Sequence, residues 1–231
     1  RSVVSGFQSI KSGDTKIIIA GGQESMSLAP HAINLRDGKK LGDANMIDTM
    51  IKDGLWDAFN GYHMGITAEN VATKFQITRK EQDKFAFNSQ EKALRAQNEN
   101  KFNDEIINFK IKLNNSEVDF KKDEHPREGI SLEALTRLKP IFQKNGTVTA
   151  GNASGINDGA AAVALMSDAE AKKRNLQKLV AIKSWASCGV DPKLMGTGPI
   201  PSTKKALELA GWSIKDIDLF EINEAFAAQS I

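Results

Sequence analysis

The feature that most limits how this chain can fold is its alternation of short apolar runs with capped, helix-forming segments. We expect strands at residues 16–20, 160–166, 179–185 and 217–222. We expect helices ending near Ile10, over residues 78–98, 167–174 and 202–211, and a last helix opened by Asn223. The run Lys16-Ile17-Ile18-Ile19-Ala20 is typical of a strand buried on both faces, as in a parallel sheet. Strands that alternate with helices predict an α/β sheet.

Helix ends are marked by their capping residues. Ser167 and Ser202 are expected N-caps, with Pro201 just before the second, and Gly211 is expected to end that helix. Thr78 and Glu81 fit a capping box. These signals predict where three helices begin and where one of them ends.

Residues from about 24 to 156 differ in character from the flanking segments. They are richer in charge, Asn and Gly, and contain few strong strand patterns. Residues 110–120 alternate loosely and are expected to form an edge hairpin. Regular structure resumes after the small-residue loop at 149–155. We therefore expect the middle of the chain to be an insertion in a sheet domain.

Composition argues against several classes of protein. The net charge is +2, from 31 basic and 29 acidic residues that are mixed throughout, which is unlike the basic face of a nucleic-acid or membrane-surface binder. The apolar runs are too short to cross a bilayer. Cys188 is the single cysteine, so the chain has no internal disulfide and no multi-cysteine metal site. We expect Cys188 to be a small buried hydrophobic residue at a strand end, in a reducing, intracellular protein.

Both ends of the chain have the pattern of helix interiors. Position 1 is not Met, Arg1-Ser2-Val3-Val4 is typical of a mid-helix segment, and residues 227–231 carry no helix stop signal. We therefore expect an internal fragment of a longer protein.

Two stretches with small or polar residues are the first candidates for a site. Gly61-Tyr62-His63-Met64-Gly65 holds one of three histidines, which is either functional or a structural hydrogen bonder. The loop at 149–155 has glycines and small side chains that would let a ligand approach the backbone closely. The alternative interpretation of this loop is a tight turn before a strand. The loop is not a phosphate-binding P-loop, because it lacks the Lys-Ser/Thr ending.

Two further candidates lie near the carboxyl end. Residues 191–201 form a long irregular connection, a type of segment that is often functional. Asn223-Glu224-Ala225-Phe226 follows an expected strand, at the sheet edge where α/β proteins place their sites. The alternative for Asn223 is a plain helix N-cap.

Taken together, these stretches resemble the successive signatures of the thiolase family, in the family's order and spacing over the whole chain. The matching residues are Gly22 to Ser27, Gly61 to Gly65, Thr67 to Asn70, Thr149 to Gly159, Met195 to Pro201 and Asn223 to Phe226. The His63-Met64 pair resembles the biosynthetic branch, the acetyl-CoA C-acetyltransferases.

The resemblance implies a thiolase fold, in which two βαβαβαββ halves are layered α-β-α-β-α and carry an inserted loop domain. Residues 1–25 and 157–177 would belong to the N-terminal half. Residues 26–156 would form the inserted, CoA-binding loop domain, and residues 178–231 would begin the C-terminal half. Full-length relatives are usually tetramers built from tight dimers, so a homotetramer is expected.

The implied activity is condensation of two acetyl-CoA molecules to acetoacetyl-CoA and CoA, together with the reverse thiolysis. A cysteine would carry the acetyl group while a second cysteine deprotonates the other acetyl-CoA. The family's nucleophile would precede Arg1, and its histidine and second cysteine would follow Ile231, so this chain alone is expected to be inactive. The CoA thioester is the substrate, and no cofactor, metal, nucleic acid or membrane is expected. We expect a cytoplasmic protein, with a mitochondrial location left open.

The resemblance also implies roles for residues of this chain. Asn223 matches the asparagine that positions a water in an oxyanion hole. Ala150 and Ser154 match positions along the pantetheine arm of CoA, and His63 matches a histidine near its end. Met64 matches the residue that narrows the acyl pocket.

The resemblance also implies apolar walls around the CoA and a charged contact at its nucleotide end. Leu55, Phe142 and Met195 match apolar walls, and Phe226 belongs to the same binding set. Arg127 matches an arginine beside the nucleotide end, where a fixed positive charge suits phosphate. A departure is Ala134, which stands where relatives often carry a serine, and it puts one CoA contact in doubt.

Two alternatives belong to other classes. The first is a non-catalytic, thiolase-like carrier of CoA or lipid, which would lack the flanking cysteines and histidine in its parent gene. The second is a generic nucleotide-binding α/β module. It needs a Gly-rich turn directly after the first strand and an acid on the ribose, and Gly21-Gly22-Gln23-Glu24 satisfies this poorly.

Overall fold

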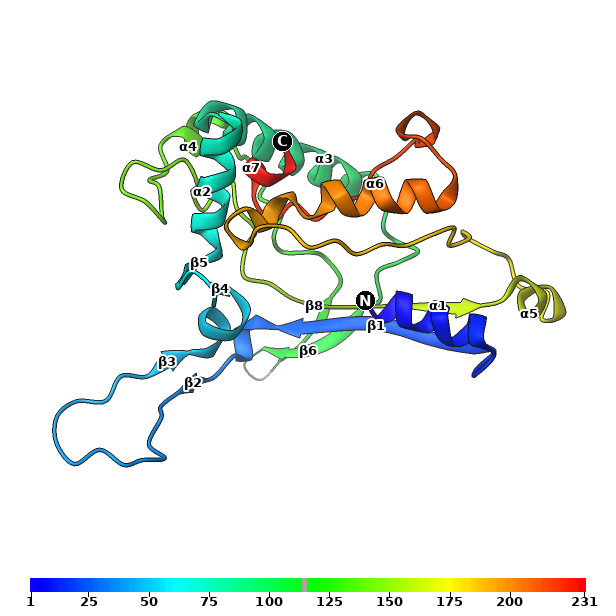
Figure 1. The fold of residues 1–231 in the computed structure, drawn as a ribbon, viewed down its shortest axis with the longest axis horizontal. Helices are drawn as coiled ribbons and strands as arrows, with labels where there is room; N and C mark the ends of the chain where they lie inside the picture. The colour runs from blue at the N-terminus through cyan, green and yellow to red at the C-terminus, as the bar shows by residue number, and fades with distance from the viewer. Residues whose placement is uncertain (114–115) are drawn as a thin grey trace. The chain divides into compact units, whose positions relative to one another are not determined.

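A computed structural model describes residues 1–113 and 116–231, and the chain in it divides into two compact units (Figure 1). Unit 1 comprises Arg1–Gly61, Ile156–Asp191 and Thr197–Glu221. Unit 2 comprises Tyr62–Gly155, Pro192–Gly196 and Ile222–Ile231. Each unit is therefore assembled from segments that are far apart in the sequence.

Unit 1 is built on two long antiparallel strands. Strand β1 (Ile17–Ser25) pairs with β8 (Asp158–Met166), and helix α1 (Ser2–Ser12) packs against both. Gly6 allows this close packing, because a Cβ there would lie 2.9 Å from Leu165 Cδ1. The helix ends at Gly13, whose φ of 86° favours glycine.

The expectation of a parallel sheet with both strands buried is wrong for this pair. The ladder is antiparallel, and Ile19 and Val163 are 71 % and 50 % exposed. A helix that packs on one face of a two-stranded ladder leaves the other face uncovered. An apolar sequence favours burial of a strand. Whether the strand is buried depends on which other elements pack against its two faces.

The other elements of unit 1 are short, apart from the 12-residue helix α6. They are η1 (Met26–Leu28), β2 (His31–Ala32), β3 (Ile47–Asp48), η2 (Met50–Gly54), β4 (Trp56–Asp57), α5 (Asp168–Lys173), α6 (Pro199–Ala210) and η4 (Ile214–Asp216). Strands β2 and β3 pair with each other in antiparallel fashion. Ser27 N and Oγ both donate to the carboxylate of Asp158, which fixes the chain after β1 to the start of β8.

Two expected strands are absent from the described residues. Residues 179–185 and 217–222 form no ladder there, and Leu179 and Leu219 are 91 % and 81 % exposed. An apolar run favours extended backbone, but a strand exists only where a second segment accepts and donates its backbone hydrogen bonds. These two predictions are therefore wrong.

The helix caps of unit 1 follow the sequence closely, with one exception. Ser167 caps α5 by accepting a hydrogen bond from Glu170 N, and α6 ends at Gly211 with φ 69°, as predicted. The predicted start of α6 at Ser202 is wrong, since the helix begins at Pro199 with Gly198 as its N-cap. Proline fits the first turn because its missing N–H has no partner there in any helix.

Unit 2 is mainly helical. It contains β5 (Tyr62–His63), α2 (Met64–Phe75), α3 (Arg79–Asn98), β6 (Phe109–Leu113), β7 (Ser116–Phe120), α4 (Leu132–Thr136) and α7 (Ala227–Ser230), and η3 (Pro192–Thr197) lies mostly within it. Helix α7 contacts α2 and α3, and α4 contacts α3. The Thr78–Glu81 capping box of α3 is confirmed. Within the described parts of the chain, no helix has the length and apolarity needed to cross a membrane.

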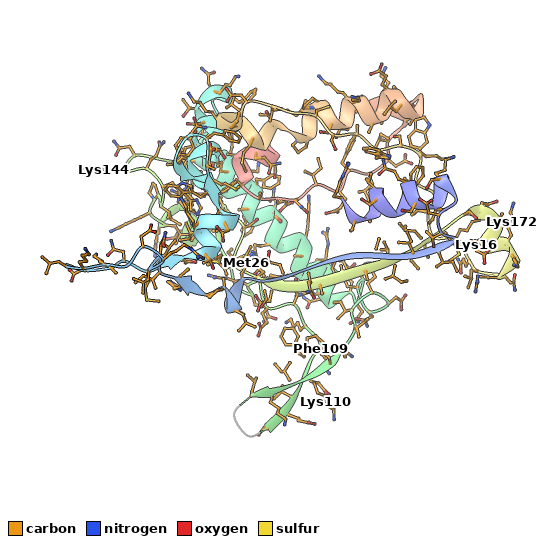
Figure 2. The ribbon with its side chains drawn as sticks, turned by 60° about the horizontal axis from the view of Figure 1, so that its bottom comes forward. Lys16, Met26, Phe109, Lys110, Lys144 and Lys172 are labelled. Carbon is orange, nitrogen blue, oxygen red and sulfur yellow. The ribbon has the colours of Figure 1, made fainter. Side chains whose placement is uncertain are left out.

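The predicted hairpin at residues 110–120 is confirmed as β6–β7. Phe109, labelled in Figure 2, lies opposite Phe120, with ring centroids 5.6 Å apart. Residues 114–115, which fall within the predicted hairpin, lie outside the described residues.

The last helix begins later than predicted. Asn223 does not cap it, because α7 starts at Ala227 and its N-cap is Phe226. The preceding backbone instead pairs with the loop after Val148: Ser154 N donates to Ala225 O, and Ala227 N donates to Asn152 O. Phe226, which lies between these two hydrogen-bonded residues, has an extended backbone (φ −145°, ψ 140°), and the helix begins only after it.

Candidate functional site

All the site residues expected from the sequence belong to unit 2, except Leu55, which lies in unit 1 between η2 and β4. The unit 2 residues are His63, Met64, Arg127, Phe142, Ala150, Ser154, Met195, Asn223 and Phe226. The candidate site can therefore be built from the elements of unit 2.

The loop at 149–155 is joined to the segment at 223–226. Ser154 Oγ donates to Glu224 O at 2.9 Å, and Ala153 forms a bridge with Phe226. The Glu224 carboxylate in turn accepts from Ser89 Oγ of α3 at 2.5 Å. Two sequence signatures separated by 70 residues thus share one surface, on which Ser154 and Asn223 are both exposed.

A row of rings lies beside this junction. His63 stacks on Phe142 with ring centroids 4.6 Å apart, and Phe142 meets Phe226 edge to face at 6.4 Å. Gly65 makes the first contact possible, because a Cβ there would lie 2.3 Å from Phe142 Cδ2. Three of the residues expected to bind substrate are therefore in direct contact.

His63 has a structural role through one ring nitrogen, and its other ring nitrogen is the one that can serve a ligand. It is the N-cap of α2, and its Nδ1 accepts a hydrogen bond from Gly65 N at 2.9 Å. In the neutral ring the proton is then assigned to Nε2. Burial lowers the pKa of His63 below its usual 6.5, which favours this neutral form. The ring is thus prepared to donate one hydrogen bond through Nε2.

Met64 and Met195 are both half-buried but come from different elements. Met64 is the first residue of α2, and Met195 lies in η3. The backbone next to Met195 is held by Asn70 Nδ2, which donates to Lys193 O at 3.1 Å. Gly196 approaches α7 so closely that a Cβ there would lie 2.8 Å from Gln229 Cγ.

The expected nucleotide-end residues are exposed. Arg127 N donates to Gln90 Oε1 of α3 at 2.9 Å, which fixes its backbone while the side chain faces solvent. Ala150 is exposed in its loop, and Ala134 is exposed in α4.

Cys188 is half-buried and does not lie at the end of a strand, so the expectation of a buried strand-end residue is wrong.

Several buried polar residues lie behind the loop, and the sequence patterns gave them no role, although Glu69 and Asn152 fall within stretches that match the family. Asn152 Nδ2 donates to Asp83 Oδ1 at 3.0 Å, and Asn152 Oδ1 accepts from Thr149 N at 2.8 Å. Asp83 also pairs with Arg79 at 2.7 Å, and Glu69 accepts hydrogen bonds from residues 147 and 148. The available signal for Glu69 was a carboxylate on the same stretch as the apolar residues Ala68, Val71 and Ala72.

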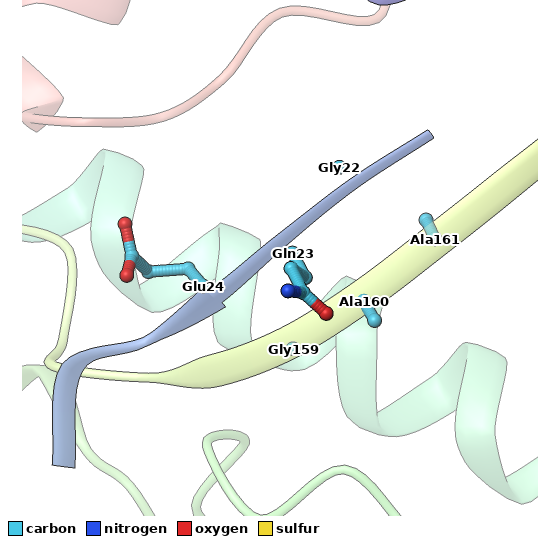
Figure 3. A pocket seen from close by; sticks show the side chains of 6 residues that line it. All are labelled: Gly22, Gln23, Glu24, Gly159, Ala160 and Ala161. Carbon is cyan, nitrogen blue, oxygen red and sulfur yellow. The ribbon is translucent and has the colours of Figure 1, made fainter. Parts of the chain in front are cut away.

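An open hollow of about 430 Å³ lies in unit 1, between the ends of β1 and β8 (Figure 3). Its lining is Gly22, Gln23, Glu24, Gly159, Ala160 and Ala161, of which four are Gly or Ala. None of the expected site residues lines it. No group of three or more His, Cys, Asp or Glu side chains suited to a metal ion occurs in the described part of the chain.

Comparison with known proteins gives one consistent answer. Residues 1–169 match the family model "Thiolase, N-terminal domain", and residues 176–231 match "Thiolase, C-terminal domain". The chain is 60 % identical over 230 residues to an acetyl-CoA acetyltransferase of Rhizobium meliloti (strain 1021), covering 100 % of this chain and 58 % of that protein.

Two solved structures have a similar fold. The Bacillus anthracis acetyl-CoA acetyltransferase matches with a TM-score of 0.96 and 45 % identity, over 99 % of this chain and 58 % of that one. Human mitochondrial 3-ketoacyl-CoA thiolase in complex with CoA matches with a TM-score of 0.93 and 43 % identity, over 99 % of this chain and 57 % of that one. The chain therefore spans 57–58 % of the length of these similar proteins.

Proposed function

The chain belongs to the thiolase family, and from that premise we propose that the whole protein is an acetyl-CoA C-acetyltransferase. The expected α/β thiolase fold is confirmed by the similarity to solved thiolases. The proposed reaction is condensation of two acetyl-CoA molecules to acetoacetyl-CoA and CoA, and its reversal by thiolysis. Support comes from the identity to an acetyl-CoA acetyltransferase over the entire chain.

The observation that carries the proposal is the junction between the loop at 149–155 and the segment at 223–226. The hydrogen bond from Ser154 Oγ to Glu224 O places Asn223 next to the loop proposed to bind the CoA arm. An amide at that point can hold a water that donates to the thioester oxygen as negative charge develops there. The acyl-carrying thiolate itself would come from a cysteine outside this chain.

The proposed substrate contacts combine small, apolar and charged side chains. Ala150 and Ser154 leave room for the pantetheine arm, and His63 Nε2 offers it a donor. Apolar walls would be provided by Phe142, Met195 and Phe226, with Met64 narrowing the acyl pocket. Arg127 would face the nucleotide phosphates, where a planar guanidinium binds well. The CoA thioester is the substrate, and the proposal includes no cofactor.

The proposed organisation follows the same family. Residues 1–25 and 157–177 would form part of the N-terminal half, residues 26–156 the inserted loop domain, and residues 178–231 the start of the C-terminal half. The family matches that end at residue 169 and begin at residue 176 support the last boundary. We propose a cytoplasmic homotetramer, a dimer of dimers.

The test uses the whole protein. Acetoacetyl-CoA cleavage by free CoA and the formation of acetoacetyl-CoA from acetyl-CoA are both measured, alongside the Kd for CoA. Turnover with both supports the proposal. Tight CoA binding without turnover supports the alternative of a non-catalytic carrier, and faster turnover of longer 3-ketoacyl-CoA substrates would contradict the assignment to the acetyl-specific branch.

A further inference from the structure

Glu69 is a buried carboxylate for which the proposed chemistry has no use. It lies in the middle of α2 and is 3 % exposed. Its oxygens accept hydrogen bonds from Thr147 N at 2.8 and 2.9 Å, from Thr147 Oγ1 at 2.9 Å and from Val148 N at 2.8 Å. All these donors belong to two consecutive residues just before the loop at 149–155.

A carboxylate at this position needs a physical reason. Burying a charged group is costly unless hydrogen bonds replace its water, and three of the other buried positions of α2 hold the apolar residues Ala68, Val71 and Ala72. An apolar residue would pack equally well but would leave two backbone N–H groups without an acceptor. A charged acceptor makes such hydrogen bonds roughly twice as strong as a neutral one. The carboxylate therefore serves to fix the backbone of residues 147 and 148.

Gly146 gives independent evidence for this close fit. A Cβ on Gly146 would lie 2.2 Å from Glu69 Oε1 and 2.8 Å from Glu69 Cδ. The residue is a glycine because of the space it must leave for the carboxylate. The backbone from Gly146 to Val148 thus wraps around one side chain.

A second carboxylate holds the same loop a few residues later. Asp83 of α3 accepts from Asn152 Nδ2 at 3.0 Å, and Gln82 Nε2 donates to Thr147 Oγ1 at 2.9 Å. Val148 and Thr149 are fully buried between these two anchors. The anchored loop then exposes Ala150 and Ser154 and pairs with the segment that follows Asn223.

We infer that Glu69 is a positioning residue of the thiolase reaction, whose carboxylate sets the loop that presents Ala150 and Ser154 to the CoA arm. Glu69 touches no substrate and acts through residues 147 and 148. The inference rests on the proposed function for the identity of the ligand. It adds a residue outside the substrate contacts on which CoA affinity depends.

The experiment compares Glu69→Gln with the wild type in the whole protein. The amide keeps the shape but replaces one acceptor oxygen by a donor that faces a backbone N–H. We expect the Kd for CoA and the KM for acetyl-CoA to rise about tenfold, which corresponds to a loss of about 1.4 kcal/mol of binding free energy when the loop is displaced. Gly146→Ala should raise both constants in the same way, because its methyl group would displace the carboxylate.

Matched controls separate positioning from general loss of stability. Glu170→Gln changes a buried carboxylate of α5 that pairs with Arg174 and contacts none of the proposed site residues. Gly189→Ala adds a methyl group where no atom lies within 4 Å. Both controls should leave the Kd for CoA unchanged, even where Glu170→Gln lowers the Tm. Thr147→Val, which removes one hydroxyl donor and keeps the shape, provides a milder variant if Glu69→Gln fails to fold.

A double variant tests the route of the effect. If Glu69 acts through the loop, the increases in KM caused by Glu69→Gln and Ser154→Ala will not add when the two are combined. Additive increases, or an unchanged Kd for CoA in Glu69→Gln, Gly146→Ala and Thr147→Val, would overturn the inference. A wild-type protein that neither binds CoA nor turns over acetoacetyl-CoA would instead refute the proposed function.

Discussion

Asn223 stands in an exposed stretch outside any helix or strand, four residues before α7 begins at Ala227. The Asn223 side chain therefore does not cap α7, although its sequence context favours that role. The proposed oxyanion role then gives the reason for an amide at this position. The distinction matters because the two roles predict different losses on mutation.

We expect Asn223→Ala to lower kcat by roughly 10²–10³-fold, the cost of losing one oxyanion donor. The Tm should change little, since no helix cap is removed. Steady-state kinetics and thermal unfolding of the whole protein measure both quantities. Asn88→Ala, at an exposed position of α3, is the control. A loss of stability with unchanged kcat would contradict the oxyanion role.

The protonation of His63 is a second property that belongs to a single residue. Burial lowers its pKa below 6.5 in the folded protein, so the unfolded chain binds a proton more readily in the window just below pH 6.5. The contribution of His63 to stability is therefore complete above that window and is lost as the pH falls through the folded-state pKa.

An NMR titration should give His63 a midpoint below 6.5, with the neutral proton on Nε2. His63→Asn keeps an acceptor for the helix cap but cannot titrate, so its stability should depend less on pH between 5 and 7, a window set by the ordinary histidine pKa of about 6.5. A midpoint at or above 6.5 would show that the ring is not held in its neutral form.

Met64 is the residue proposed to set acyl-chain length. Each methylene buried in a pocket is worth only about 1–3 kcal/mol, so steric exclusion has to do the selecting. We expect Met64→Ala to gain activity on longer 3-ketoacyl-CoA substrates and to keep activity on acetoacetyl-CoA. Comparing kcat/KM across a series of chain lengths is the measurement, and an unchanged profile would show that another group closes the pocket.

At the scale of elements, the loop at 149–155 combines a rigid interior with an exposed surface. Val148 and Thr149 are buried, and Val148 N donates to Glu69 of α2, whereas Ala150 and Ser154 are exposed. The anchored backbone fixes where the small side chains of Ala150 and Ser154 are exposed, which is what the proposed contact with the CoA arm requires.

We expect Ser154→Trp to raise the KM for acetyl-CoA strongly, because the large ring would occupy the path of the pantetheine arm. The fold should tolerate the change at an exposed position. Ser187→Trp, also at an exposed position but in unit 1, serves as the control. Unchanged kinetics of Ser154→Trp would remove this loop from the CoA site.

At the scale of the whole molecule, the polypeptide of residues 1–231 can be tested by itself. Cys188 is its single thiol, and acyl transfer in this family requires a reactive thiolate. The ladder of β1 and β8 also exposes large apolar side chains, among them Ile19 and Val163. Exposed strand edges and faces of this kind favour association between chains.

We therefore expect residues 1–231, expressed alone, to show no thiolase activity and to aggregate as the concentration rises. The assay follows acetoacetyl-CoA cleavage by free CoA, and light scattering follows association. The full-length protein is the control. Turnover near that of the full-length protein would place the catalytic groups inside this stretch, and the roles proposed here would then be wrong.

The sequence by itself determined the features whose physical cause is local. The capping box at Thr78, the cap at Ser167, the end of α6 at Gly211 and the β6–β7 hairpin depend on residues a few positions apart, so short patterns predict them. The signatures in the family's order likewise identified the family before any contact was known.

Only the tertiary structure decided which distant segments meet. The hydrogen bond between Glu69 and Val148 spans 79 positions, and that between Ser154 and Glu224 spans 70. The same pairing moved the start of the last helix from Asn223 to Ala227. Residues 179–185 and 217–222 show the converse, since their strand-like sequences form no ladder. A backbone group adopts a stable partner only when the whole fold brings that partner within hydrogen-bonding distance, and no local pattern records this.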